Sequence, residues 1–179
     1  EGMQQAMGPL PSRTALPPLD MRVRSQTDGD GFTRLNIDFL TEKNDRLPAL
    51  LYRPKARRLA KRAAILALHP TSPLGKHRVT KTGGAPNRAY AYELARRGYV
   101  VIAPDYPPFA DYAYDFESDD YVSGTMKGIL NHMRCVDLLQ SLPEVDPGRI
   151  GAIGHSLGGH NAMFVGVFDT RIKVIVSSC

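Results

Sequence analysis

Cysteine is scarce in this sequence, which contains only Cys135 and Cys179 among its 179 residues. Two cysteines cannot form a metal cluster by themselves, and their spacing does not suggest a disulfide framework, so we expect two core thiols. No apolar run approaches the ~18 to 20 residues of a membrane span, and no charged-then-apolar signal segment opens the chain. These absences exclude a disulfide-stapled scaffold and predict a soluble protein of unspecified compartment with no membrane partner.

Charge is unbalanced but not extreme. The net charge is +5 and the isoelectric point is about 9.3. Much of the excess lies in one run of basic residues, Arg53, Lys55, Arg57, Arg58, Lys61 and Arg62. This run has no interleaved aromatic residues and lies between two predicted strands, which favours a solvated connecting loop over a nucleic-acid-binding patch.

The length and the 42% hydrophobic content suit one α/β domain. Four of the fourteen prolines, at positions 9, 11, 17 and 18, crowd the start of the chain and predict an extended arm over residues 1–32. Alternating or continuous apolar patterns predict strands at residues 33–41, 47–52, 63–68, 99–103, 150–153 and 172–176. Helical spacing or composition predicts helices at residues 88–97, 122–139 and 157–168.

Strands that alternate with helices imply right-handed crossovers and a parallel sheet. The first two predicted strands, which are separated only by charged turn residues, form an antiparallel pair instead. Residues 33–179 are therefore expected to form a doubly wound, mostly parallel sheet with an antiparallel N-terminal edge.

The most informative motif is Gly154-His155-Ser156-Leu157-Gly158, which follows an apolar strand and precedes a helix. A serine hydroxyl is a poor nucleophile unless it is exposed beside a base and oxyanion-binding donors. A sharp strand-to-helix turn exposes it, and glycines two residues to either side leave room for the crossing backbones. We interpret Ser156 as the nucleophile; the alternative is a serine that merely caps the helix.

Ligands of open parallel sheets bind at the carboxyl ends of the strands, where His69, Asp105 and Ser156 all lie. The amide after the nucleophile, that of Leu157, is one expected oxyanion donor. Pro70 has no N–H, so the second donor is Thr71 or Ser72, and we choose Thr71. His69 is expected to brace this loop by hydrogen bonding; a His69, Asp105 and Ser156 triad is the less favoured interpretation.

An aromatic loop follows the predicted strand at 99–103 and starts at the same edge. Its rings belong to Tyr106, Phe109, Tyr112, Tyr114 and Phe116. Such a loop could wall an acyl or sugar pocket, with Tyr106, Phe109 and His69 nearest the substrate. A loop packed by its own side chains is an equally good interpretation.

Together, these motifs resemble those of the α/β-hydrolases, in particular the dienelactone hydrolase and acetyl xylan esterase-like branch. The resemblance is carried by His69-Pro70-Thr71, residues 98–106, Val145-Asp146-Pro147 and residues 154–159. Dienelactone hydrolases proper use a cysteine where this chain has Ser156, so the esterase side fits better. The resemblance implies hydrolysis of a small carboxylic ester, for example an acetylated carbohydrate, through an acyl-serine intermediate without a metal or another cofactor.

In that family the nucleophile is followed by an Asp or Glu and then by a His, each after a later strand. The chain stops at about the sixth predicted strand, so the resemblance implies that the acid and the base lie beyond Cys179 and that this fragment alone is inactive. Two other interpretations stay open: a non-catalytic binding protein of the same fold, and a serine peptidase. The sequence does not predict the oligomeric state.

Overall fold

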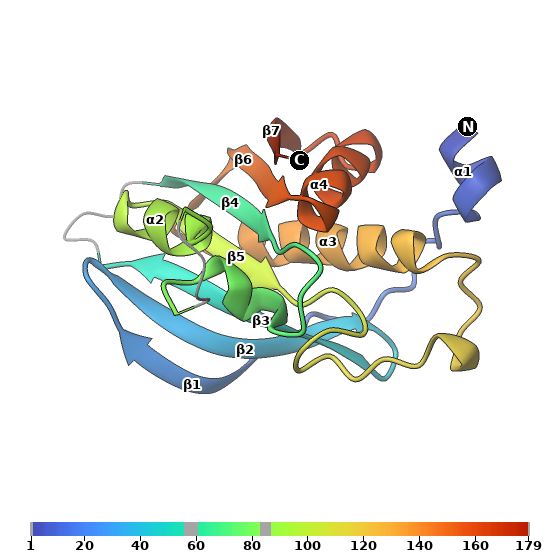
Figure 1. Ribbon diagram of the computed structural model, residues 1–179, viewed down its shortest axis with the longest axis horizontal. Helices are drawn as coiled ribbons and strands as arrows, with labels where there is room; N and C mark the ends of the chain where they lie inside the picture. Colours follow the sequence, from blue (N-terminus) through green and yellow to red (C-terminus); the bar gives the residue numbers. More distant parts are fainter. Residues whose placement is uncertain (1, 56–60, 83–86, 179) are drawn as a thin grey trace.

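The computed structural model describes residues 2–55, 61–82 and 87–178. The strands are β1 (Arg22–Asp28), β2 (Phe32–Glu42), β3 (Asp45–Pro54), β4 (Arg62–Leu68), β5 (Val100–Pro104), β6 (Val145–His155) and β7 (Ile172–Ser178). The helices are α1 (Gly2–Met7), α2 (Tyr90–Arg96), α3 (Gly124–Ser141) and α4 (Leu157–Phe168), with short 3-10 turns η1 (Gly75–Val79) and η2 (Phe116–Ser118). Within these residues the strands form one sheet (Figure 1).

The sheet has the predicted mixed topology. Its spatial order is β1-β2-β3-β5-β4-β6-β7. The pairs β1-β2, β2-β3 and β3-β5 are antiparallel, whereas β5, β4, β6 and β7 run parallel to one another. The expected α/β class, with an antiparallel edge and a parallel remainder, is confirmed. The structure adds one strand, β1, to the six expected.

The expectation of an extended arm over residues 1–32 is wrong in part, because this segment contains α1 and pairs β1 with β2 (Figure 1). Every residue of β1 is exposed, so no apolar alternation announces the strand. The intervening segment lies along α3: Arg134 donates to the Pro17 carbonyl at 2.6 Å, and Arg13 pairs with Asp137 at 2.5 Å. The proline-rich residues 8–21, here named the strap, are therefore held against α3 by these contacts.

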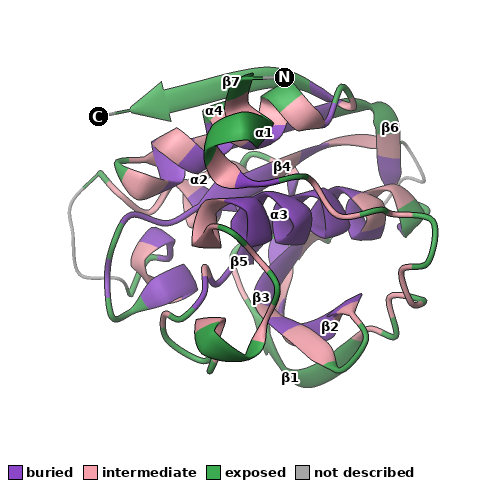
Figure 2. Cartoon of the chain, turned by 90° about the vertical axis from the view of Figure 1, so that its right-hand side faces the viewer, coloured by how far each residue is buried: buried purple, intermediate pink, exposed green. Residues whose placement is uncertain are grey.

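Helices cover both faces of the sheet. Side chains of α3 and α4 share a core with Leu51, Leu66 and Ile102, while α2 packs on the opposite face with Tyr52 and Val101. Alternate residues of the central strands therefore enter opposite cores, as their continuous apolar sequences predict. Figure 2 shows α3 almost wholly buried at the centre of the molecule.

The β7 edge of the sheet differs from its centre. Val174, Ile175 and Val176 are 62%, 41% and 49% exposed, although their side chains alternate between the two faces. On the neighbouring α4, Val167 is 65% exposed. Apolar side chains are thus uncovered on both sides of a strand whose outer edge pairs with no described residue. No helix in the described residues has the length and apolar character needed to cross a membrane.

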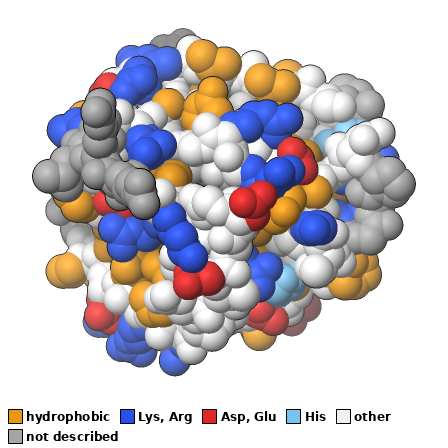
Figure 3. All heavy atoms as spheres, turned by 90° about the vertical axis from the view of Figure 1, so that its left-hand side faces the viewer, with side chains coloured by type: hydrophobic (Ala, Val, Ile, Leu, Met, Phe, Trp, Pro, Cys, Tyr) orange, Lys and Arg blue, Asp and Glu red, His pale blue; other side chains and the backbone are white. Residues whose placement is uncertain are grey.

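The basic run lies at the face where the parallel strands begin. Arg57 and Arg58 fall outside the described residues, but Arg53 pairs with Glu144 at 2.5 Å and Lys55 with Asp28 at 3.1 Å. Figure 3 shows Lys and Arg side chains spread over this face with acidic side chains between them. Of the two cysteines, Cys135 is buried as a free thiol, as expected, and Cys179 lies outside the described residues.

We expect Asp137→Asn to destabilise the fold in a pH-dependent way. Burial alone would raise the pKa of Asp137, but hydrogen bonds from Arg171 and Arg13 outweigh it and hold the pKa below 3.8. A carboxyl whose pKa is lowered by folding contributes stability above its unfolded-state pKa and loses it as the pH falls toward the folded-state value. The free energy of unfolding should drop by about 1–2 kcal/mol at pH 7, allowing for partial exposure, and the loss should shrink below pH 4.

Urea unfolding at pH 7 and pH 3.5 measures this difference. Asp146→Asn is the matched control, because Asp146 pairs with Arg149 at an exposed site and should matter little. Equal effects of the two substitutions at pH 7 would show that Asp137 does not anchor the strap.

Candidate active site

Ser156 lies at the turn between β6 and α4. Its φ of 53° and ψ of −120° are unfavourable for a residue with a side chain, and it is exposed to solvent. Its N–H donates to the carbonyl of Ser178 at 2.8 Å, which fixes the turn to β7. The Ser156 side chain makes no capping hydrogen bond within the described residues, so it does not serve as a helix cap.

The glycines around Ser156 are required by close backbone contacts. A Cβ at Gly154 would lie 2.1 Å from the backbone of Gly158, and a Cβ at Gly158 would lie 2.0 Å from the carbonyl oxygen of Leu68. Neither space can admit a methyl group, since the obstructing atoms are backbone atoms. The predicted nucleophile elbow therefore has the geometry that its sequence requires.

The same contacts bring the loop after β4 to the elbow. Leu68 pairs with Gly154 in the parallel ladder between β4 and β6, so both strands end at one edge, beside the start of α4 (Figure 1). Thr71 follows three residues after Leu68 and is exposed. Within the described part of the chain, the backbone N–H groups of Thr71 and Leu157 donate to no protein acceptor. Both remain available to a ligand.

His69 braces the loop, as expected, and is not placed to act as a base. Its ring lies between two loops: Nε2 accepts from the Tyr106 N–H at 2.9 Å, and Nδ1 lies 2.7 Å from the Pro70 carbonyl oxygen. A backbone N–H can only donate, so Nδ1 carries the ring hydrogen. Burial lowers the pKa of His69, although the Pro70 carbonyl and the Asp105 carboxylate oppose the shift. The ring is thus neutral, with both nitrogens occupied.

The less favoured triad of His69, Asp105 and Ser156 is therefore wrong. Asp105 is wholly buried and pairs with Lys76 at 2.6 Å rather than orienting an imidazole. His132 is also buried, and burial lowers its pKa to about 3. No histidine in the described residues hydrogen-bonds to the Ser156 hydroxyl.

The aromatic loop divides into two parts. Phe109 packs edge-on against the His69 ring at 5.9 Å between centroids, and Tyr106 lies beside both Phe109 and His132. These half-buried rings therefore lie beside His69, the residue that follows β4. Tyr112 and Tyr114 instead pack on each other at 5.4 Å, so this half of the loop is packed by its own side chains.

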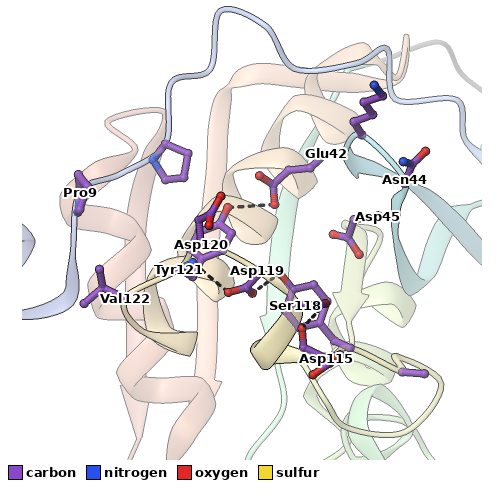
Figure 4. Close-up of a pocket in the computed structure, with 14 residues that line it drawn as sticks. Pro9, Glu42, Asn44, Asp45, Asp115, Ser118, Asp119, Asp120, Tyr121 and Val122 are labelled. Carbon is purple, nitrogen blue, oxygen red and sulfur yellow. Dashed lines mark hydrogen bonds between the residues drawn. The ribbon is translucent and has the colours of Figure 1, made fainter.

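A cavity of about 780 Å³ lies beside this second half of the loop (Figure 4). Its walls come from the strap, the turn between β2 and β3, and the segment around η2, and they do not include Ser156, Leu157 or Thr71. Its polar groups largely satisfy one another, since Tyr121 donates to Glu42 at 3.0 Å and Tyr114 donates to Asp119 at 2.5 Å. Sequence reasoning did not identify this cavity, because no local motif marks it.

A model of the dienelactone hydrolase family matches residues 79–177, which is more than half of the chain. The chain belongs to the dienelactone hydrolase family. The resemblance inferred from the motifs is thereby confirmed. The turn around Ser156 lies within the matched residues.

Two curated proteins and one solved structure illustrate the likeness. The Bacillus subtilis (strain 168) protein YtaP, which carries the name of a hydrolase, is 35% identical over 98 residues, covering 51% of this chain and 33% of YtaP. Dipeptidyl-peptidase 5 of Porphyromonas gingivalis is 33% identical over 88 residues, covering 47% of this chain and 12% of that protein. Acetyl xylan esterase 1 from Thermoanaerobacterium sp. JW/SL YS485 aligns with a TM-score of 0.70 at 17% identity, over 90% of this chain and 52% of that one, and shows a shared fold. The chain thus matches about half the length of that esterase and a third of YtaP.

Gly158→Ala should destabilise the protein strongly, because the new methyl group would meet the Leu68 carbonyl oxygen at 2.0 Å. We expect the free energy of unfolding to fall by about 2–4 kcal/mol, measured by chemical denaturation. Gly2→Ala is the control, since no atom lies within 4 Å of its added Cβ. If the two variants are equally stable, the backbones do not cross as closely as described.

Ser156→Gly and Ser156→Ala form a second matched pair. Both remove the hydroxyl, but only glycine accepts the positive φ of this position without strain. Relief of strain should outweigh the greater freedom of glycine in the unfolded chain, leaving Ser156→Gly more stable than Ser156→Ala by about 1 kcal/mol. Thermal unfolding of both variants measures the difference, and a less stable glycine variant would argue against a strained turn.

Proposed function

We propose that the protein is a serine-dependent carboxylic ester hydrolase in which Ser156 is the nucleophile. The observation that carries the proposal is the exposed hydroxyl on a strained turn whose close backbone contacts exclude any side chain at Gly154 and Gly158. Strain of this kind persists where function requires it. Membership of the dienelactone hydrolase family supports the reaction class.

In the proposed reaction, Ser156 Oγ attacks the ester carbonyl carbon while a general base takes its proton. The Leu157 and Thr71 amides hold the oxyanion, and the first turn of α4 adds the positive end of a helix dipole. Collapse of the tetrahedral intermediate releases the alcohol with a proton from the protonated base and leaves an acyl-serine. Water, activated by the same base, then frees the carboxylic acid and restores the serine. The side chains of Tyr106, Phe109 and His69 would line the part of the site that binds the acyl group.

The general base and its acid partner belong, in this proposal, to polypeptide outside the 179 residues. No described histidine hydrogen-bonds to the Ser156 hydroxyl, and both ring nitrogens of His69 are already occupied. The uncovered apolar side chains of β7, including Val174 and Val176, suit a strand edge that further polypeptide covers. The chain taken alone would then retain only the residual catalysis that an oxyanion site provides.

The substrate that we propose is a short acyl ester, with acetyl esters of carbohydrates as the first class to test. The name of the structurally similar acetyl xylan esterase supports that class. A serine peptidase is the second candidate, because the same elbow can cleave amides and because dipeptidyl-peptidase 5 is among the relatives. A non-catalytic binding protein of this fold is the third.

Ser156→Ala should reduce kcat/KM for p-nitrophenyl acetate and for acetylated xylo-oligosaccharides by at least about 1,000-fold in the intact protein. Ser12→Ala is the control, since Ser12 is exposed on the strap. Full turnover by the Ser156→Ala variant would refute the nucleophile assignment. Faster cleavage of dipeptide anilides than of esters would favour the peptidase, and ester binding without turnover in the wild type would favour the binding protein.

A further inference from the structure

The segment from His69 to Lys76, here named the 69–76 loop, includes Thr71, which is exposed. It leaves the end of β4 beside Gly158 and continues into η1. A loop amide can stabilise a developing oxyanion only if its direction is set before the reaction, because reorienting it during the reaction would cost much of the benefit. What holds the 69–76 loop therefore bears directly on the proposed chemistry.

Two contacts hold the loop at its two ends, and both lead to consecutive residues after β5. At the first end, the His69 ring accepts from the N–H of Tyr106. At the second end, the Lys76 N–H donates to Asp105 Oδ1 at 2.7 Å, and Lys76 Nζ lies 2.6 Å from Asp105 Oδ2. Thr71 lies between these two fastened ends.

The second contact is buried and tightly packed. The side chains of Lys76 and Asp105 are both 0% exposed. Lys76 Nζ also donates to Asp111 at 2.6 Å, and the Asp111 N–H donates to Asp105 Oδ2 at 3.3 Å. At Gly75, where φ is +48°, a Cβ would lie only 2.2 Å from Asp105 Oδ1. The carboxylate is thus pressed against the loop backbone and hydrogen-bonded on both oxygens.

A buried ion pair is a poor device for stability alone, since its desolvation cost is of the same order as its attraction and apolar replacements often serve as well. Its advantage is that the paired atoms fix the relative position and orientation of the two segments that carry them. Here, one carboxylate binds both the amide and the ammonium of the same lysine, so it fixes the end of the 69–76 loop in position and in orientation.

We infer that Lys76 and Asp105 are positioning residues that hold the Thr71 amide toward the Ser156 hydroxyl. The inference rests on the proposed function and adds to it: Asp105 is a structural partner of the oxyanion loop rather than the acid of a triad. Removing the pair should impair stabilisation of the transition state and leave substrate binding nearly unchanged.

The central variant is the double substitution Lys76→Met with Asp105→Asn in the intact protein. It removes both charges, keeps the lysine stem volume, and leaves an amide oxygen that can accept from the backbone N–H of residue 76. We expect kcat for p-nitrophenyl acetate to fall about 10- to 100-fold, below the full cost of an absent oxyanion donor. KM should stay within about threefold of the wild-type value.

The matched control is Lys127→Met with Asp45→Asn. Lys127, on α3, is also 0% exposed and pairs at 2.6 Å with Asp45, which lies at the turn between β2 and β3 rather than at the 69–76 loop. The control should lose comparable thermal stability while keeping kcat within about threefold of wild type. A merely structural role for Lys76 would make the two double variants behave alike.

Labelling with a p-nitrophenyl alkylphosphonate gives a second readout. Ser156 Oγ would form a bond to phosphorus, p-nitrophenolate would leave with the bonding electrons, and the hydroxyl proton would pass to the base and solvent. The adduct resembles the tetrahedral intermediate, so the labelling rate of the central variant should fall in parallel with kcat while one label per chain is still incorporated at completion.

Each outcome decides the inference. Unchanged kcat in the central variant, or an equal loss in the control, overturns it while leaving the proposed function intact. A wild-type protein that neither hydrolyses esters nor takes up the phosphonate label refutes the proposed function, and the inference with it. If the central variant does not fold, Asp105→Asn alone decides: Lys76 keeps Asp111 as a partner, and kcat should fall about 3- to 10-fold with KM unchanged, whereas an unchanged kcat overturns the inference.

Discussion

The structure depends on one close contact between backbones. At the end of β6 the chain reverses so sharply that Gly158 touches the carbonyl of Leu68 and Gly154 touches Gly158. No residue other than glycine fits either position, and Ser156 between them is forced to a positive φ. The backbone contacts that leave no room for side chains at Gly154 and Gly158 also place Ser156 at the tip of the turn, where it is exposed to solvent. Strain and exposure therefore have a single cause.

The parallel sheet then sets what surrounds that hydroxyl. Strands β4, β5 and β6 end at one edge, so the segments after them meet although they are far apart in the sequence. His69 from one segment and Tyr106 from the next are joined by a hydrogen bond, and Lys76 and Asp105 are joined by a buried ion pair. These contacts hold the loop that carries Thr71 at both of its ends, as the proposed oxyanion site would require.

The β7 side of the molecule has the opposite character. The centre of the sheet is covered by helices on both faces, whereas Val174, Ile175 and Val176 remain largely exposed. Apolar strand edges of this kind favour association with further polypeptide. The exposed edge lies next to β6, and the Ser156 amide is itself bonded to β7, so whatever covers this edge would lie close to Ser156.

Local patterns in the sequence predicted the elements whose signal is strong. The helix at residues 157–168 was predicted from its proline-free composition, the parallel strands from their continuous apolar runs, and the elbow from its motif. The exposed strand β1 was missed because its residues, apart from Val23, are polar and show no apolar alternation; its backbone pairing with β2 and side-chain contacts such as Arg24 with Asp38 appear only in the structure. The strap was misjudged because prolines report local stiffness, not the distant partners, such as Asp137, that fasten the chain.

The sequence by itself determined the class of fold and the presentation of Ser156, because both depend on residues within a few positions of one another. Only the tertiary structure decided the roles of His69 and Asp105, which share an edge with Ser156 in any reading of the sequence. Their partners, the Tyr106 amide and the Lys76 side chain, lie 37 and 29 residues away along the chain. Hydrogen bonds over such separations are set by how the sheet edge packs, and no local pattern encodes them.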